Sequence, residues 1–225
     1  MPSMFPARSQ ARRCAIRPDV ILFDQPDVDR SVQTAMTTAV YGEVVRGAKV
    51  LLREKRLGDA TDDFRWRSEP ELSRYDAARP LTVGYQEYLA LYREELLYPS
   101  PYRRSLAIED ESGRHIGNVM YYNIDAVRQE AEFGITIGER DYWGQGYGSE
   151  AARLLVEVLL TKRGFRRVHL KTLSWNRRAR RSFEKVGFTE CGRSYRSGNS
   201  FILMEVRREW LMPADQPDEV AAVTS

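Results

Sequence analysis

The sequence YWGQGYGSEA, residues 142–151, places three glycines at alternate positions directly before an apolar run. Glycine loses more conformational entropy on folding than any other residue, so this spacing indicates an unusual backbone path or a ligand against the main chain. The next residues, 150–162, predict a helix packed on a sheet, because their apolar members share one stripe: Ala152, Leu155, Val156, Leu159 and Leu160. Unpaired amides of 145–149 at the start of this helix would favour an anion.

Two known phosphate-binding loops do not fit these residues. A Walker A loop ends in Gly-Lys followed by Ser or Thr, and the chain contains no Gly-Lys pair. A dinucleotide fingerprint requires glycine or alanine at Ser149 and an acidic residue at the end of the next strand, and RRVHLKTL (166–173) has none. On its own, the motif is equally compatible with a tight strand-to-helix turn.

The composition excludes several classes of protein. With 42% hydrophobic and 30% charged residues it is typical of a soluble globular protein, and no stretch approaches the roughly 18 apolar residues of a membrane span. The 35 basic and 32 acidic residues are interleaved, which does not favour nucleic-acid binding. Cys14 and Cys191 form neither a disulfide framework nor a metal-binding motif, and the two histidines stand apart. We therefore expect a cytoplasmic protein without a metal.

The ends of the chain differ from the middle. Residues 1–18 contain four arginines and no acidic residue, which resembles a transit peptide in composition but also suits a disordered leader. Residues 27–46 show helical apolar spacing, and this helix would pack on the domain or on a partner chain, so a homodimer is one interpretation. Residues 211–225 predict a flexible tail. The chemistry is therefore expected within one domain, 47–210.

The middle of the chain predicts a mixed α/β order. We expect strands at 50–53, 105–109, 115–122, 130–137, 166–173, 188–195 and 200–207, and helices at 85–97, 150–162 and 177–186. Polar helical segments that contain DDFRWRSEPELSRYD precede the helix at 85–97. The glycine-rich motif follows the strand at 130–137.

Two further segments give the motif a family context. The run FGITIGERDYWGQGYGSEA (133–151), followed about 25 residues later by NRRARRSFEKVGF (176–188), resembles the GNAT superfamily of N-acetyltransferases. Upstream, FRWRSEPELSRY (64–75) resembles the branch that holds ribosomal-protein N-terminal acetyltransferases and spermidine or polyamine acetyltransferases. The likeness covers roughly 47–208. It implies a mixed, mostly antiparallel sheet of about seven strands flanked by helices, split between the fourth and fifth strands to admit CoA.

The resemblance also implies a site for acetyl-CoA. It places the pyrophosphate over the loop 143–149, which consists of Trp143, Gly144, Gln145, Gly146, Tyr147, Gly148 and Ser149. It pairs the pantetheine with Thr136, Ile137 and Gly138, and an N–H there, which we assign to Ile137, polarises the thioester carbonyl. Asn176 would face the pantetheine, cap its helix, or do both. Arg181 would bind the 3′-phosphate.

The chain departs from the family pattern at two positions. Trp143 stands where many relatives have Arg or Gln, so phosphate binding would rest on main-chain amides. Phe183 stands where many relatives have the tyrosine that protonates the departing thiolate, so that role is vacant or filled by water or Ser182. A thiolate with a pKa near about 8.5 is already a good leaving group, so turnover does not require this acid.

An acceptor amine must lose a proton before it attacks, so we expect a carboxylate base. Glu130 and Glu132 are the candidates, because alternation along the strand puts both on the face of Thr136. We prefer Glu132, with an exposed carboxylate in an ordinary ion pair as the alternative. Trp66, Asn118 and Tyr122 are expected to line the acceptor pocket. Charges in 56–79 are mixed, so no acidic patch indicates a polyamine.

The sequence thus predicts an acetyl-CoA-dependent N-acetyltransferase that moves the acetyl group directly to a small-molecule or peptide amine in a ternary complex. It predicts no metal, no nucleic-acid partner and no membrane. A catalytically silent acyl-CoA-binding module is the alternative, favoured by Phe183. A nucleotide-phosphate protein unrelated to CoA is a third interpretation.

Overall fold

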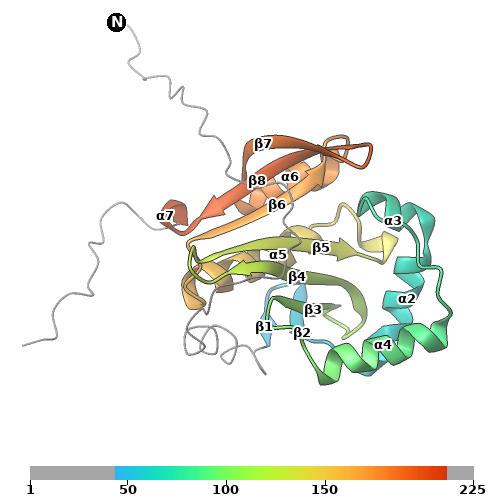
Figure 1. The fold of residues 1–225 in the computed structure, drawn as a ribbon. Helices are drawn as coiled ribbons and strands as arrows, with labels where there is room; N and C mark the ends of the chain where they lie inside the picture. The colour runs from blue at the N-terminus through green and yellow to red at the C-terminus, as the bar shows by residue number, and fades with distance from the viewer. Residues whose placement is uncertain (1–43, 212–225) are drawn as a thin grey trace, which may run out of the picture.

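The structure, a computed structural model, describes residues 44–211, and for Leu211 the main chain alone (Figure 1). The predicted leader and the tail beyond 211 lie outside this range. So does the helix predicted for 27–46, except for its last residues. There the prediction is wrong, because Val45–Arg46 form strand β1.

One sheet of eight strands organises the described residues, in the order β1-β2-β3-β4-β5-β6-β8-β7. The strands are β1 (Val45–Arg46), β2 (Val50–Glu54), β3 (Arg103–Asp110), β4 (His115–Asp125), β5 (Glu130–Ile137), β6 (Arg167–Leu173), β7 (Thr189–Arg196) and β8 (Asn199–Arg207). All neighbours are antiparallel except β5 and β6. The mixed, mostly antiparallel sheet is confirmed, and the short β1 is the strand that the sequence pattern did not show.

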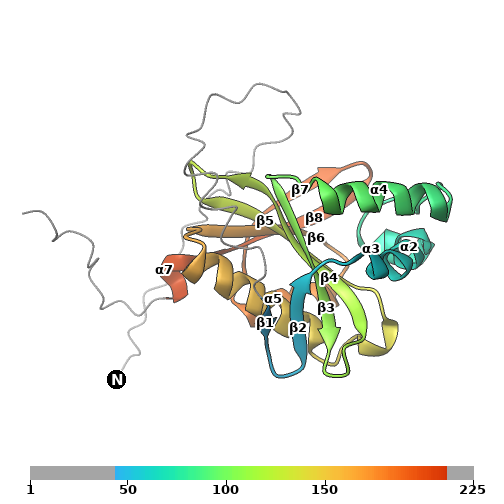
Figure 2. The ribbon, with the colours of Figure 1, turned by 90° about the horizontal axis from the view of Figure 1, so that it is seen from below.

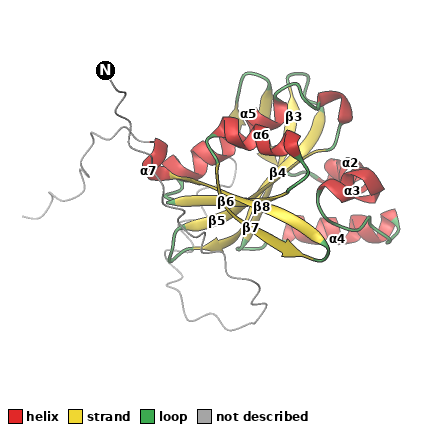
Figure 3. Cartoon of the chain, turned by 90° about the horizontal axis from the view of Figure 1, so that it is seen from above, coloured by secondary structure: helices red, strands yellow, loops and turns green. Residues whose placement is uncertain are grey.

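Most of the helices form two groups, one on a face of the sheet and one at the end of the sheet toward which β5 points. They are α2 (Ala60–Ser68), α3 (Pro70–Tyr75), α4 (Tyr85–Leu97), α5 (Tyr147–Glu157), α6 (Arg177–Val186) and α7 (Arg208–Leu211), with short 3₁₀ turns at Leu57–Asp59 and Arg140–Tyr142. In Figure 3, α5 and α6 lie together against the sheet. In Figure 1, α2, α3 and α4 form a group on the side toward which β5 points.

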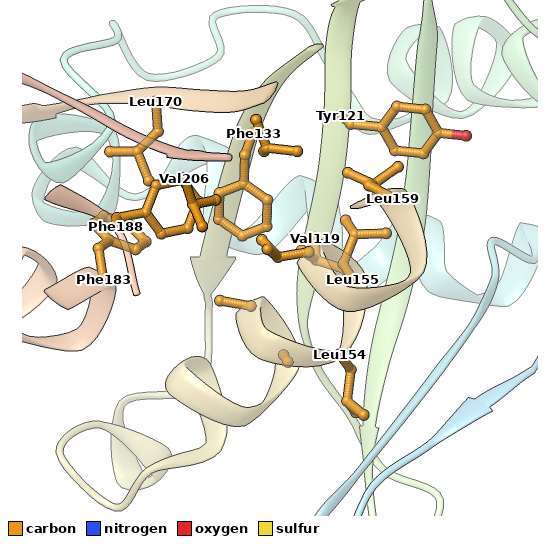
Figure 4. Packing of buried hydrophobic residues seen from close by; sticks show 14 of the residues in the cluster. Val119, Tyr121, Phe133, Leu154, Leu155, Leu159, Leu170, Phe183, Phe188 and Val206 are labelled. Atoms are coloured by element: carbon orange, nitrogen blue, oxygen red, sulfur yellow. The ribbon is translucent and has the colours of Figure 1, made fainter. Parts of the chain in front are cut away.

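Helix α5 begins three residues before its predicted start and ends at Glu157, five residues before its predicted end. The predicted helix at 150–162 is α5 followed by a π-helical turn, Val158–Lys162. The apolar stripe of α5 continues into the π-helical turn and packs on the sheet, where Leu155 lies beside Val119 and Leu159 beside Tyr121, as Figure 4 shows. Burial of this stripe between the helix and the two central strands fixes the start of α5 at the end of β5.

The sheet separates at its centre. Strand β5 pairs with β6 at three positions, Glu130 with Arg167, Ala131 with Val168 and Glu132 with His169. Beyond Glu132 the two strands diverge, and in Figure 1 the divergence opens toward α3. This is the split expected between the fourth and fifth predicted strands.

Candidate active site

The carboxyl end of β5 presents unpaired main-chain groups to the gap. Gly138 donates its N–H to the carbonyl of Ile116 on the β4 side (3.0 Å), and Ile137 lies opposite Gly117. Residues of an antiparallel strand alternate between bonding their neighbour and pointing away from it. Ile137 and Ile135 therefore direct their N–H groups away from β4. No strand of residues 44–211 pairs with them there.

This geometry corrects the predicted set Thr136, Ile137 and Gly138. By the same alternation Thr136 directs its main-chain groups toward Asn118 on β4, so Ile137 keeps its predicted place and Ile135 joins it. The carbonyl of Ile137 already accepts a hydrogen bond from the indole N–H of Trp143 (2.7 Å). The N–H of Ile137 is thus the donor that a thioester carbonyl could meet.

Position 138 requires a glycine because a side chain would not fit there. A Cβ atom at this position would lie 2.0 Å from the ring of Trp66. Trp66 is buried behind β5 and donates its indole N–H to Glu139 (3.0 Å). Trp66 does not line the cleft described below, so its predicted place in the acceptor pocket is wrong.

The loop 143–149, which we call the glycine loop, turns the chain from β5 into α5. Gly144 and Gly146 have φ of +76° and +93°, a conformation that disfavours any residue with a Cβ. Gly146 is the N-cap of α5, and its carbonyl accepts the N–H of Glu150 (3.0 Å). The N–H groups of 147–149 come before Glu150, the first residue whose N–H has an acceptor within the helix, so the helix itself cannot satisfy them.

The β1–β2 turn supports the glycine loop from outside. The ammonium of Lys49 donates to the carbonyl of Gln145 (3.1 Å) and lies 5.4 Å from the ring centre of Tyr147. The main-chain N–H of Lys49 donates to Glu150 (2.9 Å), and Figure 2 shows this hairpin beside α5. Sequence reasoning did not identify Lys49, because nothing local links it to a loop about 100 residues away.

One cleft of about 1170 Å³ joins these features. The predicted cofactor residues in its lining are Thr136, Ile137, Trp143, Gly144, Gln145, Gly146, Gly148, Ser149, Asn176 and Arg181. Gly138 and Tyr147 lie outside it, and the ring of Tyr147 packs on Tyr142 instead (4.9 Å between ring centres). The cleft therefore contains the open end of β5, the glycine loop and the first turns of α6.

Residues 49–189 match the family model for the acetyltransferase (GNAT) domain, which is more than half of the chain. The chain belongs to the GNAT family. It is an N-acetyltransferase, and the predicted enzyme class is confirmed. An uncharacterised N-acetyltransferase of Bacillus licheniformis, p20, is 28% identical over 130 residues, which are 57% of this chain and 72% of the relative.

Solved structures of the family share the fold of this GNAT chain. Spermidine N-acetyltransferase from Vibrio cholerae, in complex with CoA and spermine, superposes with a TM-score of 0.64 at 20% identity, over 72% of this chain and 98% of that one. An aminoglycoside acetyltransferase in complex with coenzyme A gives 0.60 at 20% identity, over 71% and 95%. A GNAT-family acetyltransferase from Bacillus anthracis gives 0.64 at 14% identity, over 74% and 99%.

The beginning of α6 carries two polar groups of the GNAT cleft. The side chain of Asn176 accepts the N–H of Ala179 (3.2 Å), so the capping role is confirmed. Asn176 also lines the cleft, and its contact with a pantetheine stays a prediction. One turn later, the hydroxyls of Ser182 and Ser149 lie 2.8 Å apart and connect α6 to the glycine loop.

An aromatic cluster closes one end of the GNAT cleft. The guanidinium of Arg178 lies 3.8 Å from the ring centre of Trp143, and the ring of Tyr75 meets Trp143 edge-on at 5.4 Å. Tyr75 also contacts Trp175 (5.3 Å between ring centres). We call Tyr75, Trp143, Trp175 and Arg178 the aromatic cluster. It connects α3 to the glycine loop and to α6.

Phe183 is 8% exposed and lies at the border of the cleft and the core. Its ring packs against Phe133 and Phe188, with ring centres 6.1 and 5.9 Å apart. The position that carries a tyrosine in many relatives therefore contributes to the core here. No phenol hydroxyl is available at it.

The cleft lining contains more basic than acidic side chains. Among the residues that the structure describes, the lining contains one carboxylate, Asp76, and five basic side chains: Lys171, Arg178, Arg181, Lys185 and Arg196. Asp76 follows α3 and accepts a hydrogen bond from the hydroxyl of Thr136 (3.2 Å). Asp76 keeps an exposed surface, and the surrounding walls of the cleft remove enough water from its carboxylate to raise its pKa to about 6, although the Thr136 hydroxyl opposes this shift.

Glu132, the predicted base, does not line the cleft. It is 6% exposed and accepts hydrogen bonds from the hydroxyl of Tyr122 and the amide of Asn123, both at 2.9 Å. The ammonium of Lys171 lies 3.2 Å from the same carboxylate. The expected ion pair is therefore present, although the carboxylate is buried rather than exposed.

Tyr122 lines the cleft as predicted, whereas Asn118 does not. The amide of Asn118 donates to Asp63 (2.5 Å), and its oxygen lies 3.1 Å from the ring nitrogen Nε2 of His115. Lys55 pairs with the same Asp63 at 2.6 Å. Asn118 thus belongs to a polar network between the sheet and α2, which corrects its expected role in the acceptor pocket.

Two features are absent from residues 44–211. No helix there is long and apolar enough to cross a membrane. No group of three or more His, Cys, Asp or Glu side chains there is arranged to hold a metal ion.

Proposed function

We propose that this GNAT protein transfers the acetyl group of acetyl-CoA directly to a primary amine in a ternary complex. The observation that supports this best is the continuous cleft of about 1170 Å³. It contains the unpaired main-chain groups of β5 and, next to them, the unpaired N–H groups at the start of α5. A donor that carries both amides and phosphates would use the strand end and the helix start together. The solved relatives in complex with CoA support this choice of donor.

Three parts of the cleft would hold the donor. The amides of 147–149 would receive the pyrophosphate, because the helix start supplies unpaired donors and a favourable dipole. Ile135 would pair with a pantetheine amide in the gap beside β5, and the N–H of Ile137 would face the thioester. Arg181 would bind the 3′-phosphate, since its side chain lines the same cleft.

The reaction needs one polarised carbonyl and one deprotonated amine. The N–H of Ile137 would stabilise negative charge on the thioester oxygen as the amine attacks. The thiolate leaves without a dedicated acid, because its pKa near about 8.5 already makes it a good leaving group. Phe183 is therefore compatible with turnover.

The charges of the cleft favour an acceptor with one ammonium group. Several of the solved relatives are spermidine acetyltransferases, and polyamines carry several cationic groups. The described lining here offers a cationic acceptor one carboxylate, Asp76, while Arg181 among its basic side chains is assigned to CoA. A peptide N-terminus or a small monoamine suits this balance better than a polyamine.

A silent acyl-CoA-binding module is the second candidate. The observation that favours it is the burial of Phe183, which leaves the usual tyrosine position without a proton donor. Both candidates require CoA binding, so they differ only in turnover.

Thiol release separates the candidates. Acetyl-CoA is incubated with the protein and a tetrapeptide with a free N-terminus, tyramine, an aminoglycoside or spermidine. We expect thiol release above the acceptor-free rate, with a monoamine ahead of spermidine. CoA binding without release for any amine would support the silent module. Thermal stabilisation by ATP or NAD but not by CoA would contradict both.

Two earlier expectations remain proposals. A homodimer would involve 27–46, of which 27–43 lie outside the described residues. A cytoplasmic location rests on the cysteine usage of the sequence.

A further inference from the structure

Asp76 has a defined place beside the open strand end. It follows the last residue of α3, and its main-chain N–H is bonded to carbonyls of that helix. Its carboxylate accepts the Thr136 hydroxyl, with oxygen distances of 3.2 and 3.3 Å. This contact joins the end of α3 to β5, about 60 residues away in sequence.

Thr136 precedes Ile137, the residue whose N–H faces the gap. Neighbouring side chains of a strand project to opposite faces, so Thr136 and Ile137 point to opposite sides of β5. Ile137 lies toward α5, because its side chain would be 3.3 Å from a Cβ on Gly148. Asp76 therefore stands on the other face of β5, one residue from the N–H that would polarise the thioester. An acceptor that enters from this face meets Asp76 before the thioester.

Glu132 is less suited to receive a proton. Its carboxylate already accepts two hydrogen bonds and faces the Lys171 ammonium at 3.2 Å. It lies outside the cleft lining, and Tyr122 stands between it and the cleft as a hydrogen-bond donor. An acceptor ammonium would have to displace these partners to reach Glu132, whereas Asp76 has one hydroxyl partner.

We propose that Asp76 is the general base that takes a proton from the acceptor ammonium. The inference rests on the proposed function and assigns its missing base. The ammonium gives one proton to the Asp76 carboxylate, and the nitrogen lone pair forms the C–N bond. The C–S bond then breaks, and its electron pair leaves with the thiolate. The second nitrogen proton passes through water to the thiolate, and Asp76 returns its proton to solvent.

The electrostatics of Asp76 agree with this role. A pKa of about 6 leaves the carboxylate ionised at neutral pH, yet closer to the pKa of the amine than an ordinary aspartate. Besides the Thr136 hydroxyl, Arg67 on α2 lowers the pKa of Asp76. Tyr122 on β4 faces the same region and stays neutral, because burial and then Glu132 raise its pKa.

The test measures kcat/KM for thiol release against pH, with each amine of the panel that the wild type accepts. We expect the wild-type value to rise through about pH 6 and then level. D76N should lose about 100-fold or more near neutral pH. Its remaining activity should instead rise tenfold per pH unit toward the pKa of the amine, about 8 for a peptide N-terminus and about 10 for an alkylamine, because only free amine then reacts.

Thr136→Val is the second variant, because it removes the hydroxyl that lowers the pKa of Asp76 and keeps the shape of the side chain. The rise of kcat/KM with pH should then occur at higher pH, a change that a purely structural contact would not produce. E132Q should keep this rise near pH 6. E87Q, an exposed change on α4, should match the wild type.

The outcomes separate the two proposals. If the wild type releases thiol and D76N stays within tenfold with the same profile, Asp76 is not the base and the proposed function stands. A rise at an unchanged pH in Thr136→Val would also overturn the assignment. If the wild type releases no thiol with any amine, the proposed function fails, and the role of Asp76 fails with it.

Discussion

Gly146 carries the turn on which the phosphate-binding proposal depends. Its φ of +93° is left-handed, and a Cβ there would meet no heavy atom within 4 Å. A substitution therefore changes the backbone preference and the space above the loop without a clash inside the protein. Gly113, in the β3–β4 turn, has φ of +84° and equally open surroundings. A substitution at Gly113 would therefore introduce the same backbone strain at a position outside the cleft lining, which makes it a suitable control.

We predict that G146A and G113A each lower the free energy of unfolding by about 1–2 kcal/mol, the cost of a left-handed residue with a Cβ. Only G146A should also weaken CoA binding, because the added methyl stands where the pyrophosphate would approach the amides. Urea unfolding measures the first effect and titration calorimetry the second. Equal CoA affinity in both variants would contradict the role of the glycine loop.

Asp76 should make the folded protein less stable at the pH at which it functions. Its pKa is raised from 3.8 to about 6, so its stabilising contribution is present below the unfolded value and is lost as pH rises through about 6. We predict that D76N raises Tm slightly at pH 8, since solvent screens the exposed carboxylate, and leaves it nearly unchanged at pH 4. Calorimetric melting at both values checks this. A lower Tm for D76N at pH 8 would show that the carboxylate is needed for folding.

The aromatic cluster determines how α3 is held against α6. The planar guanidinium of Arg178 lies over Trp143 and is also 5.3 Å from the ring centre of Tyr75, so one side chain contacts residues from two other segments. Lysine cannot replace this stacking, because its ammonium is a compact charge without a planar surface.

We predict that R178A lowers the free energy of unfolding by about 0.5–1 kcal/mol, the range of an exposed cation–π contact. R178K should recover only part of the loss. The control is R177A, an exposed neighbour at the first position of α6, which should stay within about 0.5 kcal/mol of the wild type. Urea unfolding followed by tryptophan fluorescence measures all three. Equal losses in R177A and R178A would contradict the stacking role.

The regular elements were the predictable part of the structure. The predicted helices 85–97 and 177–186 match α4 and α6, and the predicted strand 130–137 matches β5, because their apolar periodicity is local. The glycine loop was predictable as well, since its residues are contiguous. Strand β1 was not, because two residues carry no periodicity and take their structure from pairing with β2.

The acceptor side was the unpredictable part. Sequence alternation correctly placed Glu132 and Thr136 on one strand, but it could not show that Lys171 neutralises the former or that Asp76 contacts the latter. Asp76 stood among many mixed charges in 56–79. Its position depends on the path of α3 back to β5, which no local pattern encodes. Trp66 and Asn118 were misassigned for the same reason.

A set of buried charges joins the first helices to the sheet. Arg53 on β2 binds Asp59 through two hydrogen bonds of 2.8 Å and Glu109 on β3 at 2.5 Å, and all three side chains are at least 90% buried. Burial alone would raise the pKa of Asp59, but hydrogen bonds from Arg53 and the main chain of Arg56 outweigh it. The net pKa therefore lies below its usual value.

We predict that D59N lowers the free energy of unfolding by at most about 3–5 kcal/mol at pH 7, because it removes one of the two carboxylates that neutralise the buried Arg53. A depressed pKa contributes stability above the unfolded value, and this is lost as pH falls through the folded pKa. The difference from the wild type should therefore shrink below about pH 4. D62N, on a more exposed ion pair with Arg65, should cost at most about 1 kcal/mol. A D59N deficit that is independent of pH would contradict this account.

The early separation of β5 from β6 gives a central strand one property of an edge strand. After Glu132, Ile135 and Ile137 have no strand partner on the side away from β4 among the described residues, although β5 lies in the middle of the sheet. Unpaired strand edges are templates for association with other chains, and proteins usually protect them. A ligand that fills this gap therefore also removes an aggregation-prone edge, so cofactor supply would affect how long the protein stays monodisperse as well as how fast it reacts.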